Sequence, residues 1–142
     1  MMECHAINAF APWILIQELK CLLLASPNPD RYIVNVSAME GQFYRLKSTY
    51  HPHTNMAKAS LNMLTRTAAA GFKDDGIFMT AVDTGWVTNE SPLKRGEEET
   101  RAQPPLDELD GAMRVLDPVF SGVRGEDKVW GVFLKNYQPT KW

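Results

Sequence analysis

Histidine, serine and aspartate side chains are the first candidates for chemistry in this sequence. His51 and His53 flank a proline, and with His5 or Asp83 they could ligate zinc. A His-x-His pair without a fixed third ligand is a weak signal, so we expect no metal site. One of the loop imidazoles could instead act as an acid or base, because imidazole titrates near neutrality. Ser37 with a loop histidine and Asp83 could form a hydrolase triad, but no Gly-x-Ser-x-Gly elbow surrounds Ser37.

The elements that must position these residues alternate between helices and short apolar strands. Apolar residues most of the way round predict a largely buried helix at 7–24. The β-branched run 32–37 predicts a buried strand. Thr54 is a suitable N-cap for a second helix at 54–70, which Gly71 would stop. These helices are expected to place their neighbouring loops at the ends of the strands.

The second part of the chain continues the alternation, with a strand at 77–82, a helix at 106–120 and a strand at 129–134. A dense charge run with two prolines predicts a mobile surface segment at 88–106. Helices alternating with strands predict one α/β domain whose parallel sheet is covered by helices. In a sheet of three strands, the strand 32–37 would keep an open apolar edge, which natural proteins avoid. We therefore expect the chain to be part of a larger sheet.

Composition narrows the class of protein. Of 142 residues, 44% are apolar and 23% charged, which excludes global disorder and suffices for one core. The net charge of −2 and the absence of a Lys/Arg cluster predict no nucleic-acid partner. Three polar residues interrupt the apolar stretch 10–24, so we expect no membrane span and no signal peptide. Two cysteines fit a reduced, cytoplasmic protein.

Five segments carry motifs in a fixed order: residues 7–12, 35–41, 55–61, 82–87 and the pair 111–118 with 131–135. Together they resemble the short-chain dehydrogenase/reductase family. The first is similar to the family's Asn-x-x-Gly/Ala helix start, and the second to its Asn-x-Ser-Ser-x-x-Gly strand end. The third is similar to the active-site helix around its lysine, and the fourth to the Pro-Gly turn over the nicotinamide ring. The last pair is similar to the family's final helix and strand.

This resemblance implies a fold and a cofactor. The fold would be the C-terminal half of a doubly wound parallel Rossmann-type sheet. The family's N-terminal Gly-rich strand–turn–helix, which binds pyrophosphate at a helix N-terminus, has no counterpart in this sequence. The cofactor would be NAD or NADP, with weak or absent binding expected in this chain. By resemblance, the cofactor-contacting positions are Lys58, Thr84, Gly85, Val87 and Thr88.

The catalytic positions depart from the family pattern. Alignment on the strand-end glycine places Ala38 at the catalytic serine, preceded by Ser37, and Thr54 lies four residues before Lys58, at the catalytic tyrosine. Asn8 and Lys58 match the other members of the family's tetrad. A threonine hydroxyl is far less acidic than a phenol and shorter by a ring, so it is a poor proton donor. The resemblance therefore predicts an oxidoreductase fragment with little or no activity, its candidate site residues being Asn8, Ser37, Thr54 and Lys58.

Plainer interpretations of these residues stay open. Lys58 alone could be a solvated helix lysine, Asn8 a helix-start residue, and Thr84 with Gly85 a structural turn. The competing class of function is a non-catalytic interaction module. In the family, the helices matching 7–24 and 54–70 form a four-helix dimer interface, which predicts a homodimer here and no stable folded monomer. The side chains expected to need this burial are Phe10, Trp13, Ile14, Leu22, Leu61, Met63 and Leu64.

Overall fold

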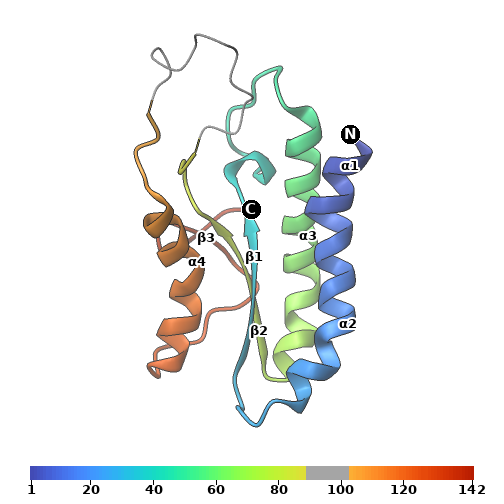
Figure 1. Ribbon diagram of the computed structural model, residues 1–142, viewed down its shortest axis with the longest axis vertical. Helices are drawn as coiled ribbons and strands as arrows, with labels where there is room; N and C mark the ends of the chain where they lie inside the picture. The colour runs from blue at the N-terminus through green and yellow to red at the C-terminus, as the bar shows by residue number, and fades with distance from the viewer. Residues whose placement is uncertain (89–102) are drawn as a thin grey trace.

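The computed structural model describes residues 1–88 and 103–142 as an α/β unit with helices on both faces of one sheet (Figure 1). In chain order the elements are α1 (Met2–His5), the π-helical turn η1 (Ala6–Phe10), α2 (Ala11–Ala25), β1 (Arg31–Ser37), the 3-10 turn η2 (Met39–Gly41), α3 (Pro52–Asp74), β2 (Ile77–Asp83), α4 (Glu108–Val123), β3 (Phe133–Lys135) and β4 (Gln138–Thr140). The segment predicted to be mobile, 88–106, lies mostly outside the described residues.

The sheet has the order β1-β2-β3-β4. The pairs β1·β2 and β2·β3 are parallel, which confirms the predicted α/β fold, and β3·β4 is antiparallel. The short strand β4 was not predicted, and β3 is shorter than the predicted strand 129–134. A tight turn joins these two strands, with positive φ at Asn136 and Tyr137. Pro139 fits β4 because β4 lies at an edge of the sheet.

The N-terminal helix is continuous from Met2 to Ala25 through α1, η1 and α2. The prediction that it is largely buried is wrong, because only Ala9 and Ile16 are buried along it. One side of the helix packs on α3, which lies beside it in Figure 1. Its other sides, apolar as well, have no cover among the described residues.

The same helix bears on the predicted absence of a membrane span. At 24 residues it is long and apolar enough to cross a membrane by length and composition, so the polar residues within 10–24 do not exclude a span. Buried core helices and signal sequences meet that criterion as well. Here the helix is joined to α3 at its C-terminal end, where Lys20 forms an ion pair with Asp75 at 2.6 Å and lies over the Phe72 ring.

The boundaries of α3 differ from those predicted. His51, with φ of 59°, is the N-cap, and Pro52 occupies the first turn, so Thr54 is a residue of the first turn and not the cap. Proline suits this position because its missing N–H would be unpaired in any case. Gly71 does not stop the helix, which continues to Asp74. A Cβ at Gly71 would meet nothing within 4 Å, so this position faces open space.

The core lies between α3 and the first two strands. Its buried cluster comprises Ile16, Ala69, Phe72, Ile77 and Met79. Helix α3 supplies the most buried positions of any helix among the described residues, and it packs closely on β2. On the other face of the sheet, α4 begins with a capping box in which Asp107 and Asp110 accept each other's backbone N–H. The helices packed on both faces of the sheet fix the carboxyl ends of β1 and β2, near which the candidate residues lie.

Candidate functional site

Two buried polar contacts fix the carboxyl half of β1 against α3. Asn35 donates its side-chain N–H to Thr65 Oγ1 at 2.9 Å, and Ser37 donates its hydroxyl to Asn62 Oδ1 at 2.5 Å. Sequence reasoning missed Asn62 and Thr65, whose spacing of three residues on one helix face was the available signal. Ser37 is 3% exposed, so its hydroxyl is a structural donor in this chain. The alternative of a nucleophilic Ser37 is not supported by this arrangement.

The turn after β1 approaches α3 very closely. A Cβ at Gly41 would lie 2.6 Å from the Lys58 carbonyl carbon and 2.6 Å from Asn62 Nδ2, so only glycine fits. This approach sets the position of Ala38, which begins the η2 turn and is half-buried. The position aligned with the family serine thus has the local framework of the site but no hydroxyl.

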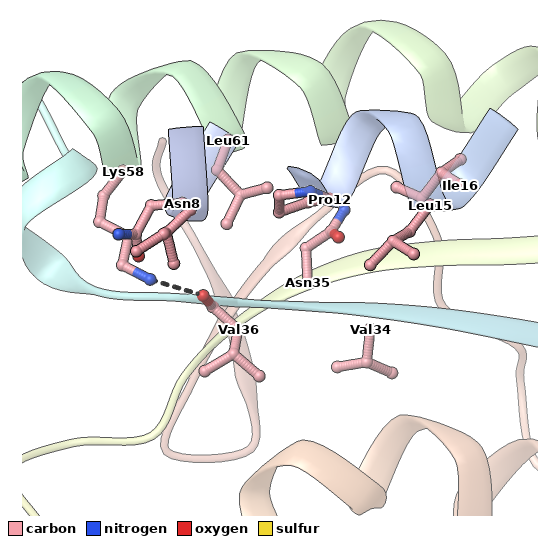
Figure 2. A pocket seen from close by; sticks show the side chains of 10 residues that line it. Asn8, Pro12, Leu15, Ile16, Val34, Asn35, Val36, Lys58 and Leu61 are labelled. Atoms are coloured by element: carbon pink, nitrogen blue, oxygen red, sulfur yellow. Dashed lines mark hydrogen bonds between the residues drawn. The ribbon is translucent and has the colours of Figure 1, made fainter. Parts of the chain in front are cut away.

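Asn8 and Lys58 enter one pocket of about 430 Å³ from two different helices (Figure 2). Lys58 lies on α3, and its ammonium donates to the Val36 carbonyl at 2.9 Å. Asn8 lies on the π-helical turn η1 and donates its side-chain amide to the Cys4 carbonyl at 3.0 Å. Turns of π-helix are frequent at functional sites. The structure therefore brings together the two predicted residues that match the family's tetrad.

Thr54 lies one helical turn before Lys58, on the same side of α3, and is half-buried. By the resemblance Thr54 aligns with the family's tyrosine, but its side chain reaches only one atom beyond Cβ. Tyr44 does not substitute for that phenol. Its hydroxyl is hydrogen-bonded to Thr140 Oγ1 at 3.1 Å, and this bond is the main cause that lowers the Tyr44 pKa. That contact holds the Tyr44 hydroxyl on β4, outside the pocket of Asn8 and Lys58.

The turn after β2 is fixed by an aspartate. Asp83 is 4% exposed, and its two carboxylate oxygens accept from the Gly85 N–H at 2.7 Å and from the Lys135 ammonium at 2.5 Å. Gly85 has φ of 79°, a left-handed conformation that favours glycine. The Asp83 carboxylate thus holds the turn at Thr84, the position that by resemblance aligns with the family's proline. The register aligns Ser37, Asp83 and Lys135 in one row across three strands.

The remaining predicted contact positions lie just beyond this turn. Val87 is half-buried and packs toward Gly111, at which a Cβ would lie 3.0 Å from a Val87 methyl group. Thr88 is exposed, and its carbonyl accepts from the Trp86 indole N–H at 3.1 Å. Thr84, which is half-buried, donates to the neighbouring Gly85 carbonyl at 3.3 Å. Val87 therefore packs on α4, whereas Thr88 lies at the surface.

The histidines do not converge on a site. His51 and His53 are exposed at the start of α3, with ring centroids 6.4 Å apart. The Asp83 carboxylate already accepts hydrogen bonds from the Lys135 ammonium and the Gly85 N–H. It is therefore not available as the further zinc ligand or as a member of a triad. Over residues 1–88 and 103–142, no group of three or more His, Cys, Asp or Glu side chains is arranged to hold a metal ion.

Solved structures with this architecture are short-chain dehydrogenases/reductases. The NADPH-bound carbonyl reductase from chicken fatty liver matches 100% of this chain at 25% identity, with a TM-score of 0.67. The carbonyl reductase Sniffer of Drosophila melanogaster matches 100% of the chain at 18% identity and a TM-score of 0.71, which supports the fold. In both cases the chain covers 57% of the other protein. The chain thus spans little more than half the length of these structures.

A curated sequence relative is longer still. An uncharacterized protein of Acanthamoeba polyphaga mimivirus is 35% identical over 111 residues, which are 73% of this chain and 24% of that protein. No family model matches the sequence. Together with the fold, these comparisons show that the chain is similar to part of a short-chain dehydrogenase/reductase domain. Its sheet is the C-terminal half of the doubly wound sheet predicted from the sequence.

Proposed function

We propose that this chain is an NAD(P)-linked short-chain dehydrogenase/reductase-like oxidoreductase fragment that does not reduce carbonyls by itself. The observation that carries this proposal is the pocket shared by Asn8 and Lys58, with Thr54 one turn away on α3. The positions of the catalytic serine and tyrosine hold Ala38 and Thr54, so the proton donor is missing. The similarity to a carbonyl reductase with bound NADPH supports the link to a nicotinamide cofactor.

The described residues fit only the nicotinamide end of such a cofactor. The Thr84–Gly85 turn lies at the carboxyl end of β2, beside the end of β1, where ligands of open α/β sheets bind. The Gly85 N–H is already donated to Asp83 and the Gly85 carbonyl accepts from the Thr84 hydroxyl, so in this proposal the Thr84 carbonyl serves the carboxamide. The sequence holds no Gly-rich turn for the pyrophosphate. Bound NAD(P) would supply the hydride, and this chain would contribute Lys58 and the turn that orients the ring.

Calorimetry with NADH and NADPH tests the cofactor part of the proposal. Without a pyrophosphate site, the expected dissociation constant is weaker than about 1 mM, or less than about 4 kcal/mol of binding free energy. A dissociation constant in the micromolar range would contradict the proposal.

Carbonyl reduction by this chain is expected to be undetectable. The substitutions Ala38→Ser and Thr54→Tyr together are expected not to restore it, because hydride transfer requires a positioned nicotinamide. Rescue by these two substitutions would show that the chain binds the cofactor productively.

A second candidate function is an interaction module that forms a homodimer through α2 and α3. Phe10, Trp13 and Ile14 on the N-terminal helix are 58%, 41% and 57% exposed, and Met63 on α3 is 55% exposed. Phe10, Trp13 and Ile14 have the i, i+3, i+4 spacing of one helix face, and burial of such an apolar face favours association, worth roughly 25 cal/mol per Å² buried. Two of the side chains that the sequence predicted to need burial by a second copy are already covered within this chain. Leu61 is buried, and Leu64 packs against the core. Leu22 is exposed, but it lies on a different side of the helix.

Light scattering over a hundredfold dilution tests the dimer. We expect a constant dimer mass at high concentration and a coupled loss of mass and helical circular dichroism on dilution. A folded monomer with native circular dichroism at the lowest concentration would contradict it. Ile14→Glu should weaken the dimer, whereas Gln17→Glu, another exposed position on the same helix, adds a charge without removing an apolar contact and serves as the control.

A further inference from the structure

The loop that joins η2 to α3 carries apolar side chains that nothing in the described part of the chain covers. Leu46 is 98% exposed, the largest value among the large apolar side chains of that part, and Phe43 is 81% exposed. The loop lies at the end of the molecule where α3 begins (Figure 1). Single exposed apolar residues are ordinary on protein surfaces, but two of them three positions apart on one loop offer apolar area to a partner.

A second pocket, of about 430 Å³, joins this loop to the first turns of α3. Phe43 and Lys47 line it from the loop, and Met56, which is 48% exposed, lines it from α3. None of these three residues lines the pocket of Asn8 and Lys58. The loop and the start of α3 therefore form a surface of their own. We name the loop surface by its five residues: Phe43, Arg45, Leu46, Lys47 and Met56.

Two basic side chains flank Leu46 on this surface. The Lys47 ammonium donates to two backbone carbonyls of η2, at 2.9 and 2.8 Å, and these bonds anchor the loop. An ammonium has three N–H donors, so one is left for a further acceptor. The Arg45 guanidinium lies over the Tyr44 ring, 5.1 Å from its centroid. Among the described residues, neither Arg45 nor Lys47 forms an ion pair.

The charge of this part of the chain differs from that of the rest. Residues 41–73 include five Lys or Arg residues and no Asp or Glu. The whole chain has a net charge of −2, so the remainder carries −7, since −2 minus +5 gives −7. Glu40 is the acidic residue that lines the second pocket, and it is half-buried. The net charge of the chain thus conceals a basic segment, and such an asymmetry is typical of contact with an anionic partner.

The apolar side chains between the cations favour a lipid bilayer over other anionic partners. Single-stranded nucleic acids are bound by aromatic rings on which their bases stack, and Leu46 and Met56 cannot act in this way. A folded acidic protein would require an interface of about 1,000 Å² or more, whereas Leu46 stands out from a short loop. At a membrane, leucine and phenylalanine enter the boundary between headgroups and acyl chains, and lysine and arginine meet anionic headgroups.

We propose that the loop surface binds the surface of a membrane that contains anionic phospholipid. Leu46 and Phe43 enter the interfacial layer, and the two basic side chains beside Leu46 contact lipid phosphates. The binding is peripheral, because a loop and the first turns of one helix make the contact. This inference goes beyond the proposed oxidoreductase function and does not depend on it, because the loop surface and the pocket of Asn8 and Lys58 have no residue in common.

Co-sedimentation of the full chain with phospholipid vesicles tests the inference. The chain is expected to sediment with vesicles of phosphatidylcholine and phosphatidylglycerol, and to bind vesicles of phosphatidylcholine alone at least tenfold more weakly. Added salt should release it, because the Debye length falls from about 10 Å at 0.1 M to about 3 Å at 1 M ionic strength. A sample centrifuged without vesicles measures aggregation.

The apolar part of the loop surface is tested by Phe43→Ser combined with Leu46→Ser. This pair should weaken binding to the anionic vesicles at least tenfold, because it removes both inserted side chains. The matched control is Leu109→Ser combined with Phe120→Ser on α4, where the same residue types are 68% and 43% exposed. The control pair should bind within twofold of the unsubstituted chain. Circular dichroism of each variant checks its fold.

The basic part is tested by Arg45→Gln combined with Lys47→Gln. This pair should weaken binding to the anionic vesicles at least tenfold and abolish the preference for phosphatidylglycerol. Its control is Arg124→Gln combined with Lys128→Gln, which removes the same charges from side chains that are paired with acidic residues. Both pairs change the net charge equally, so only the position of the charges differs between them.

Three results would overturn the inference. The first is that the chain does not sediment with anionic vesicles, or sediments equally with both kinds of vesicle. The second is that the control pairs weaken binding as much as the pairs on the loop surface do. The third is tight binding to heparin, a soluble polyanion, without binding to anionic vesicles, which would indicate a soluble anionic partner in place of a membrane.

Discussion

The two sides of β1 differ in how completely this chain buries them. Toward α3 and β2, its side chains meet buried partners such as Thr65 and Asn62, and Gly41 lies directly on the helix backbone. Along its other edge β1 has no partner strand among the described residues, and Leu15 of α2, which lines the pocket beside it, is 56% exposed. The uncovered helix α2 is the more apolar of the two helices on this face of the sheet, although α3 supplies most of the buried contacts. The difference shows that apolar periodicity predicts a surface that requires burial, but not whether the same chain supplies the cover.

Truncating leucines on the two helices should give the largest contrast. Leu61 on α3 is 2% exposed and Leu22 on α2 is 68% exposed. We expect Leu61→Ala to lower the free energy of unfolding by about 3 kcal/mol, because it leaves a cavity. Leu22→Ala should change it by less than about 0.5 kcal/mol. Urea unfolding monitored by circular dichroism measures both, and an equal loss would mean that α2 is covered in solution.

Two glycines of the same region provide the next contrast. Gly41→Ala should cost about 2–3 kcal/mol, because its Cβ would overlap the Lys58 backbone and something must shift. Gly71→Ala faces open space within α3 and should stabilise the chain by about 0.5–1 kcal/mol. Thermal unfolding of the two variants checks the opposite signs. A neutral Gly41→Ala would show that η2 is held less closely to α3 than described.

Removing the Ser37 hydroxyl should have a moderate effect on stability alone. The substitution Ser37→Ala leaves Asn62 without its buried donor, at a cost of about 1–2 kcal/mol. The control is Ser60→Ala, whose exposed hydroxyl bonds the Met56 carbonyl of its own helix, and it should change stability by less than about 0.5 kcal/mol. Equally small losses for Ser37→Ala and Ser60→Ala would contradict a stabilising role for the buried contact between Ser37 and Asn62.

The smallest expected effect concerns Tyr32 on the α4 side of the sheet. Burial is the main cause that raises the Tyr32 pKa above 10.0, with Asp30 adding to it. The folded state therefore holds this proton more tightly than the unfolded state. Its contribution to stability is complete below pH 10 and is lost as the pH rises through the folded pKa. Tyr32→Phe should remove this alkaline loss and be nearly neutral at pH 7, since the buried hydroxyl has no hydrogen-bond partner among the described residues. Urea unfolding of Tyr32→Phe and of the unsubstituted chain, each at pH 7 and pH 11, measures this difference in the free energy of unfolding.

Much of the fold could be predicted because its main elements carry strong local signals. The runs around Val34 and Met79 are short and apolar, and both form the predicted strands. The start of α3 was misplaced because Thr54 is a good N-cap by type, whereas the chain uses a left-handed His51 before Pro52. Strand β4 was missed because three polar or proline residues carry no strand pattern, and the hairpin depends on positive φ at two non-glycine residues.

The site was predictable only where the family motifs have direct counterparts. Asn8 and Lys58 meet in one pocket as their motifs indicate. The bonds of Lys58 to the Val36 carbonyl and of Asp83 to Lys135 depend on strand register and on an open edge. Neither is visible in the local sequence. The helix at 7–24 was expected to be buried for the same reason: the local sequence shows that a helix is apolar, but not whether the chain covers it.

Amide hydrogen exchange along β1 tests the difference between its two sides most directly. In the isolated chain at low concentration, the N–H groups of Ile33 and Asn35, which face β2, should be strongly protected. Those of Tyr32 and Val34, which face the open edge, should exchange much faster, because no strand accepts them. Equal strong protection at all four positions would contradict the account, since it would mean that the open edge is already covered.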